Sequence, residues 1–337
     1  GGHIAAQAAS SIPLVRDYTP SRPPAPAAAP GGRVLRVRRE APATIPGVAD
    51  FKLIAVDVDG TLLTSKGTIS DRTRAALRRA VDGGALFAVA TGRRRRTAEP
   101  IVAQLDLPHY LVSSQGAAIW QDGDLLEHSH LPAANARAAL DVISSLDMAA
   151  VVLGNAQDED ALYTFGDWEA NDRLAAYLNR NRQFIRPLNG ASLEHDPVEL
   201  IVMDTMERLE RLDVALTGHP TPPAEDAPAE GGPSPVLPLW RVIFSRNQFT
   251  AGGAIEIVGP QTSKASALDR LCQRLGLTAA QVVAFGDNVN DVEMLAFAGM
   301  GVAMGNSTED AIAVARRVAP SNDEDGIAVV LEQLGLA

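Results

Sequence analysis

The chain has little of several features that would mark particular classes of protein. It contains one cysteine, Cys272, so it cannot form an internal disulfide, and a reducing cytoplasm is the compartment that such a composition favours. No apolar run approaches the ~20 residues that cross a bilayer. Positive charge is also in deficit: the net charge is -11, whereas nucleic-acid binding needs a basic face. We therefore expect a cytoplasmic protein whose partner is neither a membrane nor a nucleic acid.

Length and composition are those of a globular protein with an added tail. The 337 residues exceed a typical single domain, and 46% of them are hydrophobic. Residues 1–50 are dominated by Ala, Pro, Gly and Arg, and they show no apolar periodicity. Such a segment buries too little apolar area to offset the entropy lost on ordering. We expect residues 1–50 to be a disordered tail followed by two domains.

From residue 51 onward, short apolar runs alternate with amphipathic segments, a pattern typical of an α/β fold with a parallel sheet. The clearest expected strands are Leu53–Val56, Leu86–Ala90, Tyr110–Val112, Val282–Phe285 and Gly301–Ala303. The expected helices are Asp71–Val81, Thr97–Leu105, Lys264–Leu275, Asp291–Ala298 and Glu309–Ala315. Chemistry in such a fold lies at the carboxyl ends of the strands.

The middle of the chain mixes strands and helices without this alternation, which indicates an inserted α+β domain. A hairpin-type turn at 121–124 precedes it. Helices are expected around Ala133–Leu146 and at Met206–Leu216, and strands near Ala149–Leu153, Leu200–Met203 and Arg241–Ser245. Residues 218–239 are rich in Pro, Ala, Glu and Gly, so we expect them to form a flexible loop.

Two acidic turns follow expected strands. Asp57 and Asp59 flank the end of the first strand, and Gly60 then bends the chain. Asp287 and Asp291 flank a sharp turn after the strand Val282–Phe285. Each turn has an ordinary explanation, because Asp and Gly are common turn residues and Asp caps helices. Two such turns at two strand ends favour a site for Mg²⁺, a hard cation that selects carboxylate oxygens.

Two further features fall at the same edge of the expected sheet. Thr91-Gly92-Arg93 follows the strand Leu86–Ala90, and its hydroxyl and backbone N–H groups suit a phosphate oxygen. Lys264 begins a helix after a loop. Taken alone, Thr91 is also explained as a helix cap and Lys264 as a solvated surface lysine.

Together these motifs resemble the haloacid dehalogenase-like superfamily, specifically its Cof-type phosphatases with a class IIB cap. The sequences DVDGTLL at 57–63, TGR at 91–93, Lys264 and GDNVND at 286–291 stand in family order. The resemblance covers residues 51–337. It implies a Rossmann-like core made of residues 51–127 and 259–337, with an inserted α+β cap at 128–258. One departure is Gln115-Gly116-Ala117, where the family often has Asn-Gly-Ala.

The resemblance also implies a mechanism. Asp57 is expected to be the nucleophile that forms an aspartyl-phosphate, and Asp59 the general acid and base. Mg²⁺ is expected to bind Asp57, the carboxylate or carbonyl of Asp59, Asp287 and, at or near the ion, Asp291. The transferring phosphoryl oxygens are expected to contact a set of donors on four segments: Val58, Thr91, Gly92, Lys264 and Asn290.

The expected activity is hydrolysis of a small-molecule phosphomonoester, such as a sugar phosphate, FMN or pyridoxal phosphate. A phosphosugar mutase is an alternative, because the same phosphoaspartate can return its phosphoryl group to a sugar. A ligand sensor without catalysis is another alternative. It is disfavoured because every chemical position is filled, including Asp59, whose proton an alkoxide leaving group needs.

Overall fold

The structure is a computed structural model that describes residues 50–154, 161–188, 193, 195–218, 239–247 and 252–337. Apart from Asp50, the expected tail lies outside the described residues, and so does the expected loop apart from Gly218 and Leu239. Within the described ranges, no helix combines the length and the hydrophobicity that crossing a bilayer requires.

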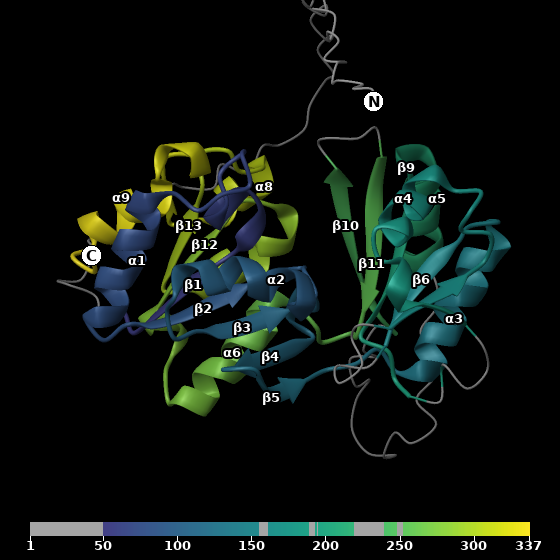
Figure 1. Ribbon diagram of the computed structural model, residues 1–337, viewed down its shortest axis with the longest axis horizontal. Helices are drawn as coiled ribbons and strands as arrows, with labels where there is room; N and C mark the ends of the chain where they lie inside the picture. Colours follow the sequence, from purple (N-terminus) through teal and green to yellow (C-terminus); the bar gives the residue numbers. More distant parts are fainter. Residues whose placement is uncertain (1–49, 155–160, 189–192, 194, 219–238, 248–251) are drawn as a thin grey trace, which may run out of the picture. The chain divides into compact units, whose positions relative to one another are not determined.

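The larger sheet has eight strands within the described residues, in the order β14-β13-β12-β1-β2-β3-β4-β5 (Figure 1). They are β1 (Leu53–Val56), β2 (Leu86–Ala90), β3 (Tyr110–Ser113), β4 (Ala118–Gln121), β5 (Asp124–His128), β12 (Val282–Gly286), β13 (Met300–Ala303) and β14 (Arg317–Val318). Neighbouring strands from β14 to β3 are parallel, whereas β4 is antiparallel to both of its neighbours, β3 and β5. The expected α/β core with a parallel sheet is thus confirmed.

Helices cover both faces of this sheet (Figure 1). They are α1 (Asp71–Asp82), α2 (Arg95–Val102), α6 (Lys264–Leu275), α7 (Val292–Phe297), α8 (Glu309–Val314) and α9 (Gly326–Gln333). Ile54 and Val56 of β1 pack in one apolar cluster with α1, α2 and α9, while Leu53 and Ala55 pack in another with α6, α7 and α8. Successive strand residues point to opposite faces, so a strand covered on both sides is apolar throughout.

The smaller sheet has the strand order β10-β11-β9-β6-β7-β8 among the described residues. Its strands are β6 (Ala150–Leu153), β7 (Leu162–Phe165), β8 (Ile185–Pro187), β9 (Glu199–Thr205), β10 (Arg241–Asn247) and β11 (Gly252–Val258). Its helices are α3 (Ala133–Ser145), α4 (Asp172–Asn179) and α5 (Met206–Thr217). One face packs against α3 and α5. On the other face, Leu174 and Leu178 of α4 join the apolar cluster that contains Val151, Leu153 and Ile201.

All strands of the smaller sheet fall inside residues 128–258, which we call the cap segment, although its boundaries stay a prediction. The two linkers that join this segment to the larger sheet lie side by side. The hydroxyls of Ser129 and Thr262 are hydrogen-bonded at 2.7 Å. Gly259 lies so close to the carbonyl of His130 that a Cβ there would be 2.3 Å from its oxygen. The cap segment therefore begins and ends at one place.

Several elements have bounds close to those expected, and others have no strong signal in the sequence. Helix α6 has the expected bounds, and the hairpin turn at 121–124 is present with Asp122 and Gly123 at positive φ. By contrast, β11 was not expected, because its sequence Gly252–Val258 begins with two glycines, which are depleted in strands. Its two antiparallel partners, β9 and β10, supply the hydrogen bonds that make it a central strand.

Candidate active site

The register of the larger sheet brings three strand ends to one edge. Val56 of β1 lies opposite Val89 of β2 and Phe285 of β12. The next residues of these strands lead to Asp57, to Thr91 and to Asp287, respectively. Because the strands are parallel, these side chains meet at the carboxyl edge of the sheet. The sequence-based expectation that the two acidic turns converge agrees with this arrangement.

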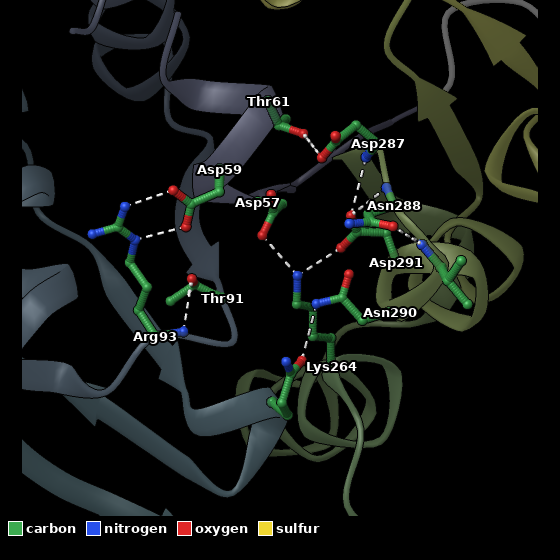
Figure 2. Close-up of polar contacts among 12 residues, drawn as sticks. Asp57, Asp59, Thr61, Thr91, Arg93, Lys264, Asp287, Asn288, Asn290 and Asp291 are labelled. Atoms are coloured by element: carbon green, nitrogen blue, oxygen red, sulfur yellow. Dashed lines mark hydrogen bonds and ion pairs between the residues drawn. The ribbon is translucent and has the colours of Figure 1, made fainter. Parts of the chain in front are cut away.

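Lys264 lies at the centre of the acidic residues (Figure 2). Its Nζ donates to Oδ1 of Asp57 and to Oδ1 of Asp291, at 2.7 Å each. The lysine is 1% exposed, so it is not the solvated lysine that its sequence context alone allows. Ser263 caps the start of α6 with a reciprocal hydrogen-bond pair with Ser266, which fixes the first helical turn that carries Lys264.

Asp291 is also held by the turn that contains it. Its Oδ2 accepts hydrogen bonds from the backbone N–H groups of Asp287 and Asn288, at 3.0 and 3.1 Å. Its other oxygen contacts Lys264. Asp287 accepts a hydrogen bond from the hydroxyl of Thr61 at 3.2 Å. Both carboxylates are therefore oriented by partners within the protein.

This cluster carries more negative than positive charge. Burial, together with the charges of Asp291 and Asp287, raises the pKa of Asp57 well above its ordinary value, although Lys264 opposes the shift. Burial and the charge of Asp291 raise the pKa of Asp287 to about 7. Burial alone would lower the pKa of Lys264, but Asp291 and Asp57 outweigh it and raise that pKa. An additional cation would stabilise the ionised carboxylates.

The residues present fit a divalent cation. Asp57, Asp287 and Asp291 are buried, and each offers a carboxylate oxygen such that these oxygens lie within 4.8 Å of one another. Oxygen donors of this kind suit Mg²⁺. Gly60 makes room for this cluster: its φ is +83°, and a Cβ at this position would lie 2.3 Å from Oδ2 of Asp287. Only glycine satisfies both conditions without strain.

The carboxylate of Asp59 does not join this cluster. It forms a two-pronged ion pair with Arg93, at 2.6 Å to Nε and 2.5 Å to Nη2, and its side chain is 58% exposed (Figure 2). The turn Val58–Leu62 explains the difference: Asp59 and Gly60 leave the helical conformation there, which directs Asp59 toward β2. The structure therefore gives no support to the Asp59 carboxylate as a metal ligand, and a role for its carbonyl stays a prediction.

The expected phosphate-binding residues surround the same edge. Thr91 is 1% exposed, and its hydroxyl accepts a hydrogen bond from the backbone N–H of Arg93 at 3.1 Å. Val58 is buried in the turn after Asp57. A Cβ on Gly92 would lie 2.3 Å from Nε2 of Gln115, so Gln115 passes directly over this glycine. Asn290 donates to Oε1 of Gln115 at 3.1 Å.

Sequence reasoning missed some members of this site. Thr61 lies inside the DVDGT motif but had no assigned role, and its bond to Asp287 shows what it contributes. Nδ2 of Asn306 donates to the carbonyl of Gly60 at 2.8 Å and so supports the turn. Glu256, on β11, accepts a hydrogen bond from Gln115. No motif surrounds Glu256, so no sequence signal could have indicated it.

The chain thus has an α/β fold whose parallel sheet carries acidic residues and one buried lysine at its carboxyl edge, where sites of such folds lie. The model of the haloacid dehalogenase-like hydrolases matches residues 54–331. The chain is 29% identical over 284 residues to the 5-amino-6-(5-phospho-D-ribitylamino)uracil phosphatase YitU of Bacillus subtilis, covering 83% of this chain and 96% of that protein.

Another relative is the HMP-PP phosphatase of Serratia proteamaculans, at 32% identity over 262 residues, 76% of this chain and 85% of that protein. Among solved structures, a haloacid dehalogenase-like hydrolase of Bacillus subtilis matches with a TM-score of 0.65 and 26% identity, covering 84% of this chain and 100% of that one. The chain belongs to the haloacid dehalogenase-like hydrolase family. The expected membership in its phosphatase branch is confirmed by these relatives.

Proposed function

We propose that the protein is a Mg²⁺-dependent phosphatase that hydrolyses a small phosphomonoester through an aspartyl-phosphate on Asp57. The observation that carries this proposal is the buried cluster of Asp57, Asp287 and Asp291 around Lys264. A carboxylate at the end of a buried strand is available to attack, and the neighbouring acidic residues have the donor type of a Mg²⁺ site.

In the first step, an oxygen of Asp57 attacks phosphorus, and the bond between phosphorus and the ester oxygen breaks. Asp59 gives its proton to that leaving oxygen. In the second step, Asp59 takes a proton from water, the water oxygen attacks phosphorus, and inorganic phosphate leaves as Asp57 is regenerated. In the structure Arg93 holds both oxygens of the Asp59 carboxylate, so Asp59 must leave this ion pair and take up a proton before it acts as the acid.

Asp57, Asp287 and Asp291 would hold the metal ion, with the carbonyl of Asp59 as a further donor. When bound, Mg²⁺ supplies positive charge that lets a carboxylate approach a phosphate dianion. The Nζ of Lys264, the hydroxyl of Thr91 and backbone N–H groups near Val58 and Gly92 would stabilise the charge on the transferring phosphoryl group. Asn290 completes this set through its side-chain amide.

The proposed substrate is a small phosphorylated metabolite of the sugar phosphate, FMN or pyridoxal phosphate class. One relative is named as a phosphatase of a phosphate ester on a ribityl chain, and this supports an ester with a hydroxylated organic group. A cytoplasmic location, which we expect from the single thiol, belongs to the same proposal.

Phosphate release with 4-nitrophenyl phosphate and a panel of phosphometabolites tests the proposal. We expect turnover with Mg²⁺, loss of turnover in EDTA and recovery when Mg²⁺ is restored. Asp57→Asn should lose essentially all activity, whereas Asp82→Asn, an exposed Asp on α1, is the matched control and should keep it. Full activity of Asp57→Asn, or turnover that EDTA does not affect, would contradict the mechanism.

A further inference from the structure

A cavity of about 530 Å³ adjoins the catalytic edge and is large enough for the organic part of a metabolite. Gln115, Lys264 and Asn290 line it where it meets the catalytic residues. Arg241 and Ile243 of β10 line it from the cap segment. A phosphate placed beside Lys264 would therefore direct its organic group between the core and β10.

Glu256 is not one of the residues that line the cavity, but its position in the smaller sheet places it next to one that does. It lies opposite Ile243 in the antiparallel pair of β10 and β11, so the two side chains share a face. Its neighbours Ile255 and Ile257 point the other way, into the apolar cluster with α3 and α5. The carboxylate of Glu256 thus faces the core, and burial raises its pKa to about 7.

Gln115 connects this carboxylate to the catalytic edge. Its Nε2 donates to Oε2 of Glu256 at 2.5 Å, and its Oε1 accepts from Asn290 at 3.1 Å. Ser114 and Gln115 have φ values of +47° and +58°, which non-glycine residues rarely adopt. Such a conformation persists only where the surroundings impose it, and it often marks a functional site. Here it places the Gln115 amide between Glu256 and Asn290.

The charges around the cavity restrict what can enter it. Arg241 is paired with Glu293 at 2.5 Å, so the positive charge on that wall is neutralised. Glu256 keeps a second oxygen that can accept hydrogen bonds, since a carboxylate accepts several. A hydroxyl or amino group would be favoured beside this oxygen, whereas a second anionic group would be repelled.

From this arrangement we infer that Glu256 and Gln115 form the subsite for the organic part of the substrate and select its class. They restrict the enzyme to phosphomonoesters whose organic group donates hydrogen bonds and carries no second negative charge. This inference rests on the proposed phosphatase activity. It favours hydroxylated or amino-bearing esters over bisphosphates and phosphorylated carboxylic acids, and it thereby disfavours a mutase that needs a sugar bisphosphate.

Three esters of matched chain length test the inference with the full-length protein and Mg²⁺ at pH 8, above the pKa of about 7 that burial gives Glu256. Ribitol 5-phosphate offers hydroxyl donors, pentyl phosphate offers none, and 5-phosphoribonate adds a carboxylate to the hydroxylated chain. We expect the kcat/KM of the wild type for ribitol 5-phosphate to exceed both others by about tenfold to a hundredfold, the strength of a hydrogen bond to a charged group. Similar values for all three would overturn the inference.

Two variants separate charge from hydrogen bonding. Glu256→Gln removes the charge at nearly constant shape, and the preference for ribitol 5-phosphate over 5-phosphoribonate should fall at least tenfold. Glu256→Ala should also lower the preference for ribitol 5-phosphate over pentyl phosphate. Glu210→Gln, an exposed position on α5, is the matched control and should leave both ratios unchanged.

A uniform loss across the three esters in Glu256→Gln would instead assign Glu256 a structural role and refute the inference. Thermal unfolding of each variant shows whether it folds. If Glu256→Ala does not fold, Glu256→Gln alone still decides the test. Failure of the phosphatase proposal itself has a different signature. In that case wild-type protein releases no phosphate from any of the esters or from 4-nitrophenyl phosphate.

Discussion

Replacing Lys264 by methionine would remove the cation that holds Asp57 and Asp291 together. Methionine fills a similar volume but carries no charge. The lysine Nζ is 2.7 Å from one oxygen of each carboxylate, and its side chain is 1% exposed. Without it, the three carboxylates of the cluster would face one another in a buried site with no neighbouring lysine. The protein should respond by losing stability and by taking up protons.

Removing one partner of a buried ion pair typically costs about 3–5 kcal/mol, because the remaining charge stays buried. For a chain of this size, 1 kcal/mol corresponds to about 2 °C in Tm, so we expect a decrease of roughly 6–10 °C in EDTA at pH 8. The pKa of Asp57 is already raised by burial, so its folded state binds protons more tightly than its unfolded state. The loss should therefore shrink as the pH falls toward 5.

Calorimetry of wild type, Lys264→Met and the double variant Lys264→Met/Asp291→Asn in EDTA measures this effect. The double variant should recover a large part of the lost Tm, because it removes one of the repelling charges. Lys66→Met, at an exposed lysine, is the control. Activity with Mg²⁺ should fall at least about 100-fold in Lys264→Met, the usual cost of losing one preorganised donor.

Two outcomes would refute this reasoning. One is a Tm of Lys264→Met within about 2 °C of the wild-type Tm in EDTA at pH 8, which corresponds to a loss of less than about 1 kcal/mol in the free energy of unfolding. The other is a double variant that is no more stable than the single one. Either result would show that the cluster does not depend on the lysine charge.

Three further predictions concern the same region. Gly60→Ala should weaken Mg²⁺ activation in a titration of activity, because its Cβ would lie 2.3 Å from Oδ2 of Asp287 at a φ of +83°; an unchanged activation constant would contradict this. Asp59→Asn should slow turnover by about 10²–10⁴-fold, the usual contribution of an acid–base group. Acid quenching of this variant with 4-nitrophenyl phosphate should trap the phosphoenzyme, and absence of the trapped phosphoenzyme would count against the mechanism. Burial raises the folded-state pKa of Glu256 to about 7, so its contribution to stability is present at low pH and is lost as the pH rises through about 7. The Tm of the wild type should therefore fall more between pH 5 and 8 than the Tm of Glu256→Gln. Parallel plots of Tm against pH for the two proteins would refute this prediction.

The larger sheet could be predicted well because its signals are local. β1 is a short, fully buried strand with the acidic turn directly after it, and α6 begins at a Ser cap. In a parallel sheet, the ends of the strands and their order together decide which residues meet, and here β1 lies between β2 and β12. The convergence of Asp57, Thr91 and Asp287 follows from this rule without any knowledge of distances.

The remaining features depend on contacts that the sequence does not encode locally. Gln115 and Glu256 are 141 residues apart and lie at different sheets, so their hydrogen bond could not be read from spacing. The burial of Lys264 could not be read from its helix either, because the carboxylates that compensate its charge come from two other segments. The carboxylate of Asp59 pairs with Arg93 and not with the cluster at Asp57, which a motif alone does not specify.

The close contact between the two linkers has a consequence for how such an enzyme can acquire a new specificity. Ser129 and Thr262 are hydrogen-bonded, and Gly259 leaves no room for a side chain beside His130. Both ends of the cap segment thus lie at one junction, and the proposed catalytic and metal-binding residues all lie outside this segment. Recombination at this junction would exchange Glu256 while Gln115 and the catalytic edge stay in place, which makes it a natural position for building chimeric phosphatases.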